Sequence, residues 1–353
     1  MKKYNIEFDC QTVENVSYNH CFSDMALFRR LYVGNAGDQD IEGVVLEISS
    51  EPEFLLTYGK EFDVLKSGSV VSVDTGEIKL SPVYLSSLSE KRQGTVSVKL
   101  VKDKATIAEF KKEVNILGYY DWDAAETEML STFVRPKTFA AVKLLKDAES
   151  ILTKWKLNAE FTGYKLSDKT KIRNIAAAVF TAIQNLGIKI VPTKAADGIY
   201  TFSNLSKILE TKEASAHDLM LLYASALEAA GINPILVFGG KTVYAGLWLI
   251  DNCFDEIVGD DPTVIKKRLA GGVNEIAVFL IDKLLTQTLS FAGAEKTSTA
   301  AFNGETEVTI VDVKRARAGI VRSLPERVKT AKGYDILEEE DLRGAAPKSI
   351  VEL

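Results

Sequence analysis

The first third of the chain shows short hydrophobic runs and alternating apolar and polar positions. Residues 41–50, 77–81, 95–101 and 105–116 are the clearest of these segments, and turn-forming residues separate them. Alternation with a period of two is typical of strands that turn one face toward a core. We therefore expect residues 1–118 to be β-structure throughout, with no helical segment between the strands.

The spacing of these segments indicates how the strands are arranged. Breaks at 34–38, 51–52 and 66–68 recur at the intervals found in a two-layer sandwich, and residues 102–104 (Lys-Asp-Lys) have the composition of a hairpin turn. This pattern favours an immunoglobulin-like sandwich. Its polar residues are dispersed along the strands, as on solvated faces, so we expect no catalysis in this region.

After residue 118 the hydrophobic period becomes helical. Apolar positions spaced by three and four residues predict helices over 124–134, 138–156 and 168–186. The first of them ends before a proline and the third before a glycine, which are residues that terminate helices. A short aromatic strand is expected at 200–202.

A fourth amphipathic helix is the most informative segment of the chain. Ser215 is its expected N-cap, Asp218 completes an S-x-x-D capping box, and Gly231 ends it. Two hydrophobic runs, 234–238 and 243–250, follow as strands. Unpaired N–H groups at a helix start favour a thiolate or an oxyanion, so a helix that begins against a sheet is a candidate site of chemistry.

The remaining segments are shorter. We expect a helix over 262–269 and a strand over 275–281, after which the pattern weakens. Residues 305–313 have the composition of a strand. The acidic residues of 251–261 and the basic residues of 314–317 are interpreted as solvated surface in preference to a cation site or a phosphate contact.

These segments predict a multidomain protein with three regions. Residues 1–118 form the sandwich, residues 119–290 an α+β domain, and residues 291–353 an extended strand/helix tail or linker that becomes acidic after residue 334. The last residues carry neither a helix cap nor a turn signal. This ending favours a chain cut at a linker.

Composition restricts the classes of function. The net charge is −6 and no broad basic stripe is present, so nucleic-acid binding is not indicated. Three unclustered cysteines, no apolar leader and no run of membrane length lead us to expect a cytoplasmic protein without membrane association. Only His20 and His217 could act as an imidazole base or zinc ligand, and we expect no metal and no cofactor.

Several blocks of sequence resemble one protein family. They are 50–54 and 85–90 in the first region, then 133–136 (Phe-Val-Arg-Pro), 218–234 and 245–249 (Ala-Gly-Leu-Trp-Leu). The chain is similar to the N-terminal region of large bacterial superfamily-1 helicase–nuclease proteins linked to antiviral defence. In these proteins an immunoglobulin-like sandwich and a transglutaminase-like (papain-like) domain precede the motor. No G-x-x-x-x-G-K-[ST] motif occurs here, so the link to a helicase rests on the resemblance.

The resemblance implies a Cys-His-Asp triad whose positions can be located in this sequence. The family's nucleophile, in a G-T-C-x-D motif, corresponds to Ala216 within residues 214–218 (Ala-Ser-Ala-His-Asp). Its histidine corresponds to Thr242 and its acid to Asp282. Because thioester chemistry needs a thiolate and a base, the resemblance implies a triad that has lost two of its three groups.

Three residues near these positions have two interpretations each. Ala216 is either a natural loss or a replacement of a native cysteine, and the second alternative leaves Thr242 unexplained, so we favour the first. His217 is either a displaced base or a side chain that faces solvent or a neighbouring loop. Asp282 is either the relic of a catalytic acid or a turn former.

The leading hypothesis is a non-catalytic recognition or scaffolding module. A cleft that includes His217, Asp218, Tyr244 and Trp248 would bind a protein or peptide partner, although the aromatic residues are equally expected in a core. The alternative is a cysteine protease or transglutaminase whose nucleophile was replaced at Ala216. A third possibility is a structural spacer.

Overall fold

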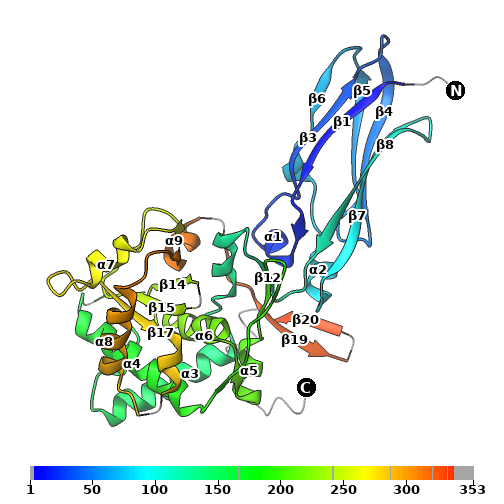
Figure 1. The fold of residues 1–353 in the computed structure, drawn as a ribbon. Coiled ribbons are helices and arrows are strands. Elements are labelled where there is room, and N and C mark those ends of the chain that lie inside the picture. Colours follow the sequence, from blue (N-terminus) through cyan, green and yellow to red (C-terminus); the bar gives the residue numbers. More distant parts are fainter. Residues whose placement is uncertain are drawn as a thin grey trace. The chain divides into compact units, whose positions relative to one another are not determined.

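A computed structural model describes residues 4–337 except residues 166, 241, 287, 320 and 332. The chain separates into two compact units with mixed helices and strands (Figure 1). The first unit extends to Asp121 and takes in the short segment Gly333–Asp335, and the second begins at Trp122 and extends to Ala331. Each unit is described by itself below.

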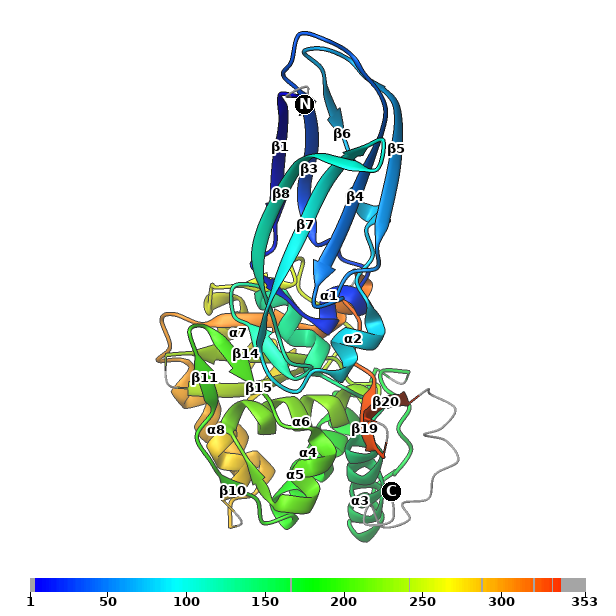
Figure 2. The same cartoon turned by 90° about the vertical axis from the view of Figure 1, so that its right-hand side faces the viewer.

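The first unit consists of two layers of strands that are antiparallel except for the β2–β8 pair (Figure 2). Alternating strands bury one face each, and the inner positions of β3, β4 and β7 supply the core between the layers. One sheet has the order β1-β3-β6 and the other β2-β8-β7-β4-β5, where the strands are β1 (Ile6–Thr12), β2 (Asn15–Val16), β3 (Phe28–Asn35), β4 (Ile41–Glu51), β5 (Tyr58–Leu65), β6 (Val70–Ser72), β7 (Arg92–Lys102) and β8 (Ala105–Ile116).

The β7–β8 connection confirms the predicted hairpin at residues 102–104. Lys102 pairs with Ala105, and the two residues between them, Asp103 and Lys104, have φ angles of 49° and 63°. Two left-handed residues in a two-residue loop match the twist of the flanking strands. The sequence pattern therefore located this turn correctly.

Three short helical elements correct the expectation of uninterrupted β-structure. They are α1 (Tyr18–Phe22), the 3-10 turn η1 (Thr75–Glu77) and α2 (Pro82–Ser87). The strand predicted at 77–81 is wrong, because Ser81 accepts a hydrogen bond from Tyr84 N and so begins α2. Pro82 at the first helical position also favours a helix start here. The strand prediction did not account for this proline.

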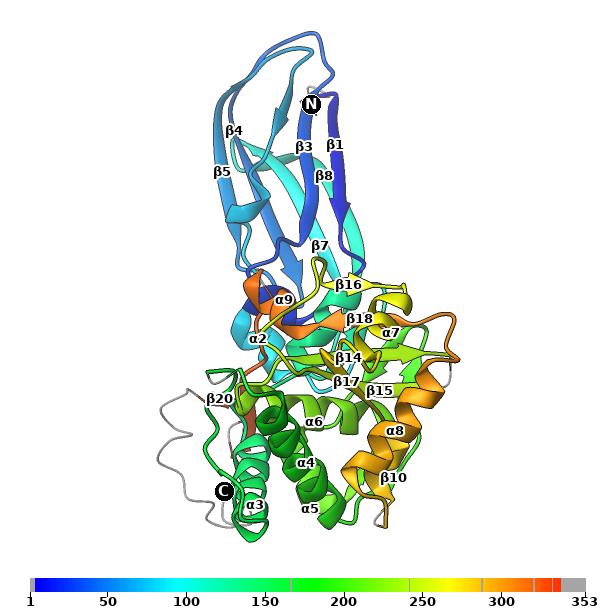
Figure 3. The same cartoon turned by 90° about the vertical axis from the view of Figure 1, so that its left-hand side faces the viewer.

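The second unit is built on a five-stranded antiparallel sheet with the order β16-β18-β14-β15-β17. Short strands and helices surround this sheet, and Figure 3 shows α3, α4 and α6 together on one side of it. The strands are β9 (Asp121–Asp123), β10 (Lys189–Ile190), β11 (Lys194–Ala196), β12 (Ile199–Thr201), β13 (Glu213–Ala214), β14 (Pro234–Gly239), β15 (Thr242–Trp248), β16 (Val258–Gly259), β17 (Ile276–Leu280) and β18 (Thr309–Asp312). The helices are η2 (Thr127–Phe133), α3 (Phe139–Lys154), α4 (Lys169–Asn185), α5 (Leu205–Thr211), α6 (Ala216–Ala229), α7 (Thr263–Leu269), η3 (Ile281–Leu285), α8 (Phe291–Phe302) and α9 (Val313–Ala318). The strand β19 (Glu326–Thr330) also belongs to this unit, and the last described strand of the chain is β20 (Gly333–Leu337).

Most predicted elements of this unit are present, with two corrections. The helix expected at 124–134 is the 3-10 element η2. The region 291–353 is not a tail throughout. Helix α8 begins at its first residue, and β18 lies inside the sheet between β16 and β14. Part of the acidic stretch expected after residue 334 forms β20, and residues 338–353 lie outside the described residues.

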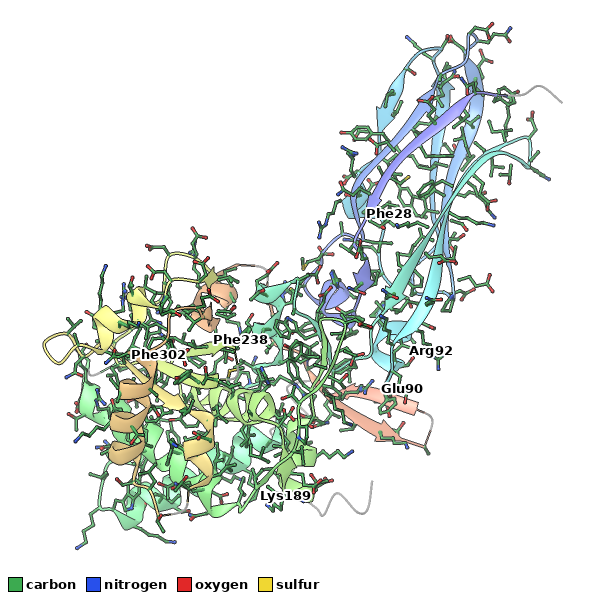
Figure 4. The ribbon with its side chains drawn as sticks, in the orientation of Figure 1. Phe28, Glu90, Arg92, Lys189, Phe238 and Phe302 are labelled. Atoms are coloured by element: carbon green, nitrogen blue, oxygen red, sulfur yellow. The ribbon has the colours of Figure 1, made fainter. Side chains whose placement is uncertain are left out.

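The two faces of this sheet carry different side chains, because side chains alternate along each strand. Helix α8 contacts both faces, one through its first residue and the other through its last. Phe279 on one face contacts Tyr223 of α6, with ring centroids 6.2 Å apart. On the other face Tyr244 packs against Phe302 of α8 at 5.3 Å. We call these the α6 face and the α8 face. Phe238, on the α6 face, and Phe302, over the α8 face, are labelled in Figure 4.

Candidate functional site

The start of α6 forms as predicted. Ser215 is the N-cap, and its hydroxyl oxygen accepts a hydrogen bond from Asp218 N at 3.1 Å. In return, Ser215 N donates to Asp218 Oδ2 at 3.0 Å. This reciprocal pair is a capping box, and it confirms the interpretation of the sequence at these two positions.

The carboxylate of Asp218 has a structural task in addition to the cap. Its Oδ1 accepts a hydrogen bond from Ser203 N at 2.7 Å, and its Oδ2 lies 3.1 Å from the Ser203 hydroxyl. Asp218 is buried, so these donors replace the water that a carboxylate otherwise needs. Asp218 therefore joins the start of α6 to the loop before α5, and its oxygens are occupied by the protein itself.

His217 is half-buried in an aromatic cluster. Its ring centroid lies 5.4 Å from that of Tyr200 and 6.2 Å from that of Phe238. Its Nδ1 lies 3.1 Å from the hydroxyl oxygen of Thr193. Burial lowers the pKa of His217 below its ordinary value, and the nearby charge of Asp218 opposes this shift in part. A neutral imidazole in an apolar cluster is therefore favoured.

Trp122 is the centre of this aromatic cluster. Its ring centroid lies 5.2 Å from Tyr200, 6.1 Å from Phe202 and 5.9 Å from Phe238. Rings at these separations pack against one another. The sequence indicated the aromatic strand at 200–202, but it gave no signal that Trp122 and Phe238 join it around His217.

Thr242, which the resemblance aligns with a histidine, lies on the α8 face. Antiparallel pairing sets Val243 opposite Phe238, so these two residues share the α6 face. Thr242 precedes Val243 and therefore turns to the other side of the sheet, where its hydroxyl oxygen lies 2.9 Å from Glu305 Oε1. The structure does not bring Ala216 and Thr242 together.

Tyr244 and Trp248 also lie on the α8 face and are buried in its core. The Tyr244 hydroxyl donates to Glu305 Oε1 at 2.7 Å, and burial together with this carboxylate raises the pKa of Tyr244. The Trp248 indole donates to Asp312 Oδ2 at 2.9 Å. The expected cleft that combines these aromatics with His217 and Asp218 is therefore not formed, because strand alternation places them on the opposite face.

Asp282, where the resemblance implies an acid, lies in η3 just after β17. Its side chain is 61% exposed and pairs with the adjacent Lys283 at 3.2 Å. Within the described residues its carboxylate contacts this lysine and no imidazole. Its setting matches the turn-forming alternative that the sequence left open.

A groove lies at the opposite end of α6. Its volume is about 590 Å³, and its lining includes Gly163 and Tyr164 from the α3–α4 connection and Gly231 from the end of α6. The Tyr164 hydroxyl accepts from Asn233 N at 2.9 Å and donates to Trp248 O at 2.8 Å. These two bonds fix the connection against the sheet. No pattern in the sequence indicated this groove.

The basic residues of 314–317 serve the structure of the second unit. Arg317 pairs with Glu228 through Nε at 2.9 Å and Nη2 at 3.2 Å. Lys314 pairs with Asp251 of the acidic loop. These contacts tie α9 to the end of α6 and explain both charged stretches in part as internal ion pairs.

Comparison of this chain with known protein families, with curated proteins and with solved structures finds no match. In the described part of the chain, no group of three or more histidine, cysteine, aspartate or glutamate side chains is arranged to hold a metal ion. Over the same residues, every helix is too short or too polar to cross a bilayer.

Proposed function

We propose that this chain is a non-catalytic recognition module for a protein partner. In this proposal the first unit is an immunoglobulin-like sandwich and the second a transglutaminase-like domain without its triad. Both belong to the front of a helicase–nuclease protein of antiviral defence. The resemblance of the sequence blocks supports the family. The geometry around α6 supports the loss of chemistry.

One observation carries the proposal: the sheet offers apolar side chains to the start of α6. Phe238 and Val243 occupy the α6 face where a base would have to lie, and Thr242 contacts Glu305 on the other face. Residue 216 is an alanine at the first helical position. A nucleophile placed there would find neither a proton acceptor nor an orienting acid.

The alternative is an acyl-transfer enzyme whose native cysteine was replaced at Ala216. Its nearest imidazole would be that of His217. Neighbouring residues of a helix point about 100° apart, so a side chain at 216 does not face the next one. The imidazole of His217 is also held by Thr193 and the aromatic cluster. This geometry disfavours the alternative.

Restoring the thiol tests the loss of chemistry. In a background with Cys10, Cys21 and Cys253 changed to serine, Ala216→Cys is compared with Lys169→Cys, which is also the first residue of a helix. The pH midpoint of iodoacetamide labelling should agree within about one unit between the two, since both thiols feel only a helix start. The proposal would be contradicted if Ala216→Cys formed a burst of acyl-enzyme from p-nitrophenyl acetate and its labelling midpoint lay two or more pH units below that of Lys169→Cys.

Recognition is tested in cells of the source organism with photoreactive side chains. They are placed at Tyr200 beside the aromatic cluster, at Phe161 in the groove, and at Val142, which is 40% exposed on α3, as the control. We expect one discrete protein adduct at Tyr200 or Phe161 and none at Val142. Absence of an adduct from both test positions, or the same adducts at all three, would remove the recognition hypothesis.

A further inference from the structure

The groove at the C-terminal end of α6 has the size of a binding site. Its volume of about 590 Å³ lies within the roughly 300–1,000 Å³ that is typical of ligand pockets. It is open and largely polar, which suits a chain segment better than an enclosed small molecule. Residues 161–165 of the α3–α4 connection and the segment that follows α6 both line it.

Two segments of main chain pack directly against each other in the lining of this groove, at Gly163 and Gly231. Both have left-handed φ angles, +55° and +77°, and a Cβ atom at Gly163 would lie 2.7 Å from Gly231 O. Neither position tolerates a side chain without strain. The two glycines therefore hold the α3–α4 connection against the end of α6 and define this wall of the groove.

The carboxylates of the groove are neutralised from within the protein. Glu228 is held by both guanidinium contacts of Arg317, and Asp251 pairs with Lys314, which lowers the pKa of Asp251. Lys165 also lines the groove, and its ammonium makes no ion pair or hydrogen bond within the described residues. The unpaired charge available in the groove is therefore positive.

The first half of the same connection forms a basic and apolar rim. Residues 153–158 are all exposed, and among them Trp155 and Leu157 are 43% and 39% exposed. The ammonium groups of Lys154 and Lys156 have no partner in the described chain. Since four residues span at most roughly 14 Å, Leu157 lies within that distance of Phe161 in the groove.

The backbone at Lys156 is held in a conformation that favours glycine. Its φ is 59°, and the bonds from Lys156 N to Thr153 O and from Leu157 N to Leu152 O, both 3.0 Å, form a Schellman ending for α3. A glycine would adopt this conformation without strain, yet the position carries a lysine. Strain of this kind is often found at functional sites.

We propose that the groove and its rim bind an extended acidic segment of a partner protein. Carboxylates of that segment face Lys154, Lys156 and Lys165, and an apolar side chain covers Trp155 and Leu157. The inference rests on the proposed recognition function and names its surface and the chemistry of its partner. A leucine beside the tryptophan favours a peptide over a nucleic acid, because a leucine offers a base no stacking surface.

The test uses synthetic peptides and the intact chain. The probe is an acetylated ten-residue peptide that alternates Glu and Leu, and the controls alternate Gln and Leu or Lys and Leu. Trp122 and Trp248 are 1% and 0% exposed, so Trp155 is the tryptophan whose fluorescence responds to a surface ligand. Calorimetry gives the affinity, at 50 and 300 mM salt.

We expect the Glu–Leu peptide to bind at least tenfold more tightly than the Gln–Leu peptide at 50 mM salt, and to lose most of this preference at 300 mM. The variant Lys154→Gln/Lys156→Gln/Lys165→Gln should abolish the preference, whereas Lys66→Gln/Lys91→Gln/Lys112→Gln, at exposed positions of the first unit, should keep it. Equal loss in both variants would overturn the proposal. So would tighter binding of oligothymidylate, or of phosphatidylcholine–phosphatidylglycerol vesicles, than of the peptide.

A single variant separates charge from fold. Lys156→Gly removes the ammonium and suits the left-handed backbone, so we expect weaker peptide binding with an unchanged or higher melting temperature. Unchanged binding would contradict a role for Lys156. Failure here leaves the photo-crosslinks and the thiol test of the proposed function unaffected, so the two proposals can fail separately.

Discussion

The two ends of α6 are built in opposite ways. At the N-terminal end, where the resemblance implies a nucleophile, the side chains contact one another. The Asp218 carboxylate accepts hydrogen bonds from Ser215 and Ser203, and His217 lies among aromatic rings. At the C-terminal end, Gly231 meets a second glycine and an open groove remains. The comparison teaches that the position at which a resemblance places an active site does not by itself locate the open surface of the fold.

Among the substitutions that test this comparison, removing the carboxylate of Asp218 should have the largest effect on stability. Asp218→Ala leaves the buried donors of Ser203 and Ser215 without an acceptor, and we expect a loss of about 2–4 kcal/mol in the free energy of unfolding. Urea denaturation measures it. Asp255→Ala, on the exposed acidic loop, is the control and should change stability by less than about 0.5 kcal/mol. Equal effects would mean that the N-terminal end is not held by this cap.

Filling the glycine contact tests the C-terminal end. A side chain at Gly163 meets both backbone strain and the Gly231 carbonyl at 2.7 Å, whereas Gly187 has φ +65° and nothing within 4 Å of an added Cβ. We expect Gly163→Ala to cost about 2–3 kcal/mol and Gly187→Ala about 1 kcal/mol. Thermal unfolding of both variants checks the difference. Matching losses would show that the backbone contact is dispensable.

Acid should lower the stability of the folded chain through His217 at the N-terminal end of α6. The pKa of His217 in the folded chain is below its ordinary value of 6.5. Between these two values the unfolded chain binds more protons, so stability falls as pH drops through that window, by up to about 1.4 kcal/mol per pH unit. His217→Phe keeps the ring in the cluster and should flatten this slope in urea titrations at pH 5 to 7.5. A slope that persists would assign the acid sensitivity to other groups.

The smallest expected effect is a difference in sign between the stability changes of two glycine substitutions, at Lys156 and Lys154. Lys156→Gly should gain up to about 1 kcal/mol, because the backbone there is left-handed, whereas Lys154→Gly in the last turn of α3 should lose about 1 kcal/mol. Melting temperatures of the pair report it. Losses in both variants would mean that Lys156 is not strained.

Local sequence signals predicted local structure well. The capping box at Ser215 and Asp218, the hairpin at 102–104 and the helix begun by Thr138 depend on neighbouring residues, and all three are present. The signals failed where tertiary packing decides. Helix α8 has small and polar residues along much of its length, and β18 pairs with strands that lie more than fifty residues earlier in the chain.

The candidate site was predictable only in part. The sequence located the start of α6 and the strands that follow it. A family alignment cannot show that Thr242 turns away from α6, because a shift of one residue along a strand changes the face of the sheet. Glu305, which contacts both Thr242 and Tyr244, lies where the hydrophobic pattern is weak, and the glycine contact of the groove joins residues 68 positions apart.

The place of β18 in the sheet has a consequence for synthesis on the ribosome. Its residues, Thr309–Asp312, are the last of the five strands to be made, yet they pair with β14 near the middle of the sheet. Until they leave the exit tunnel, one edge of β14 has unpaired N–H and C=O groups that invite pairing with another chain. A nascent chain stalled before Thr309 therefore exposes a strand edge that can pair with other chains. Any truncated version of this protein made for laboratory use should extend past Asp312.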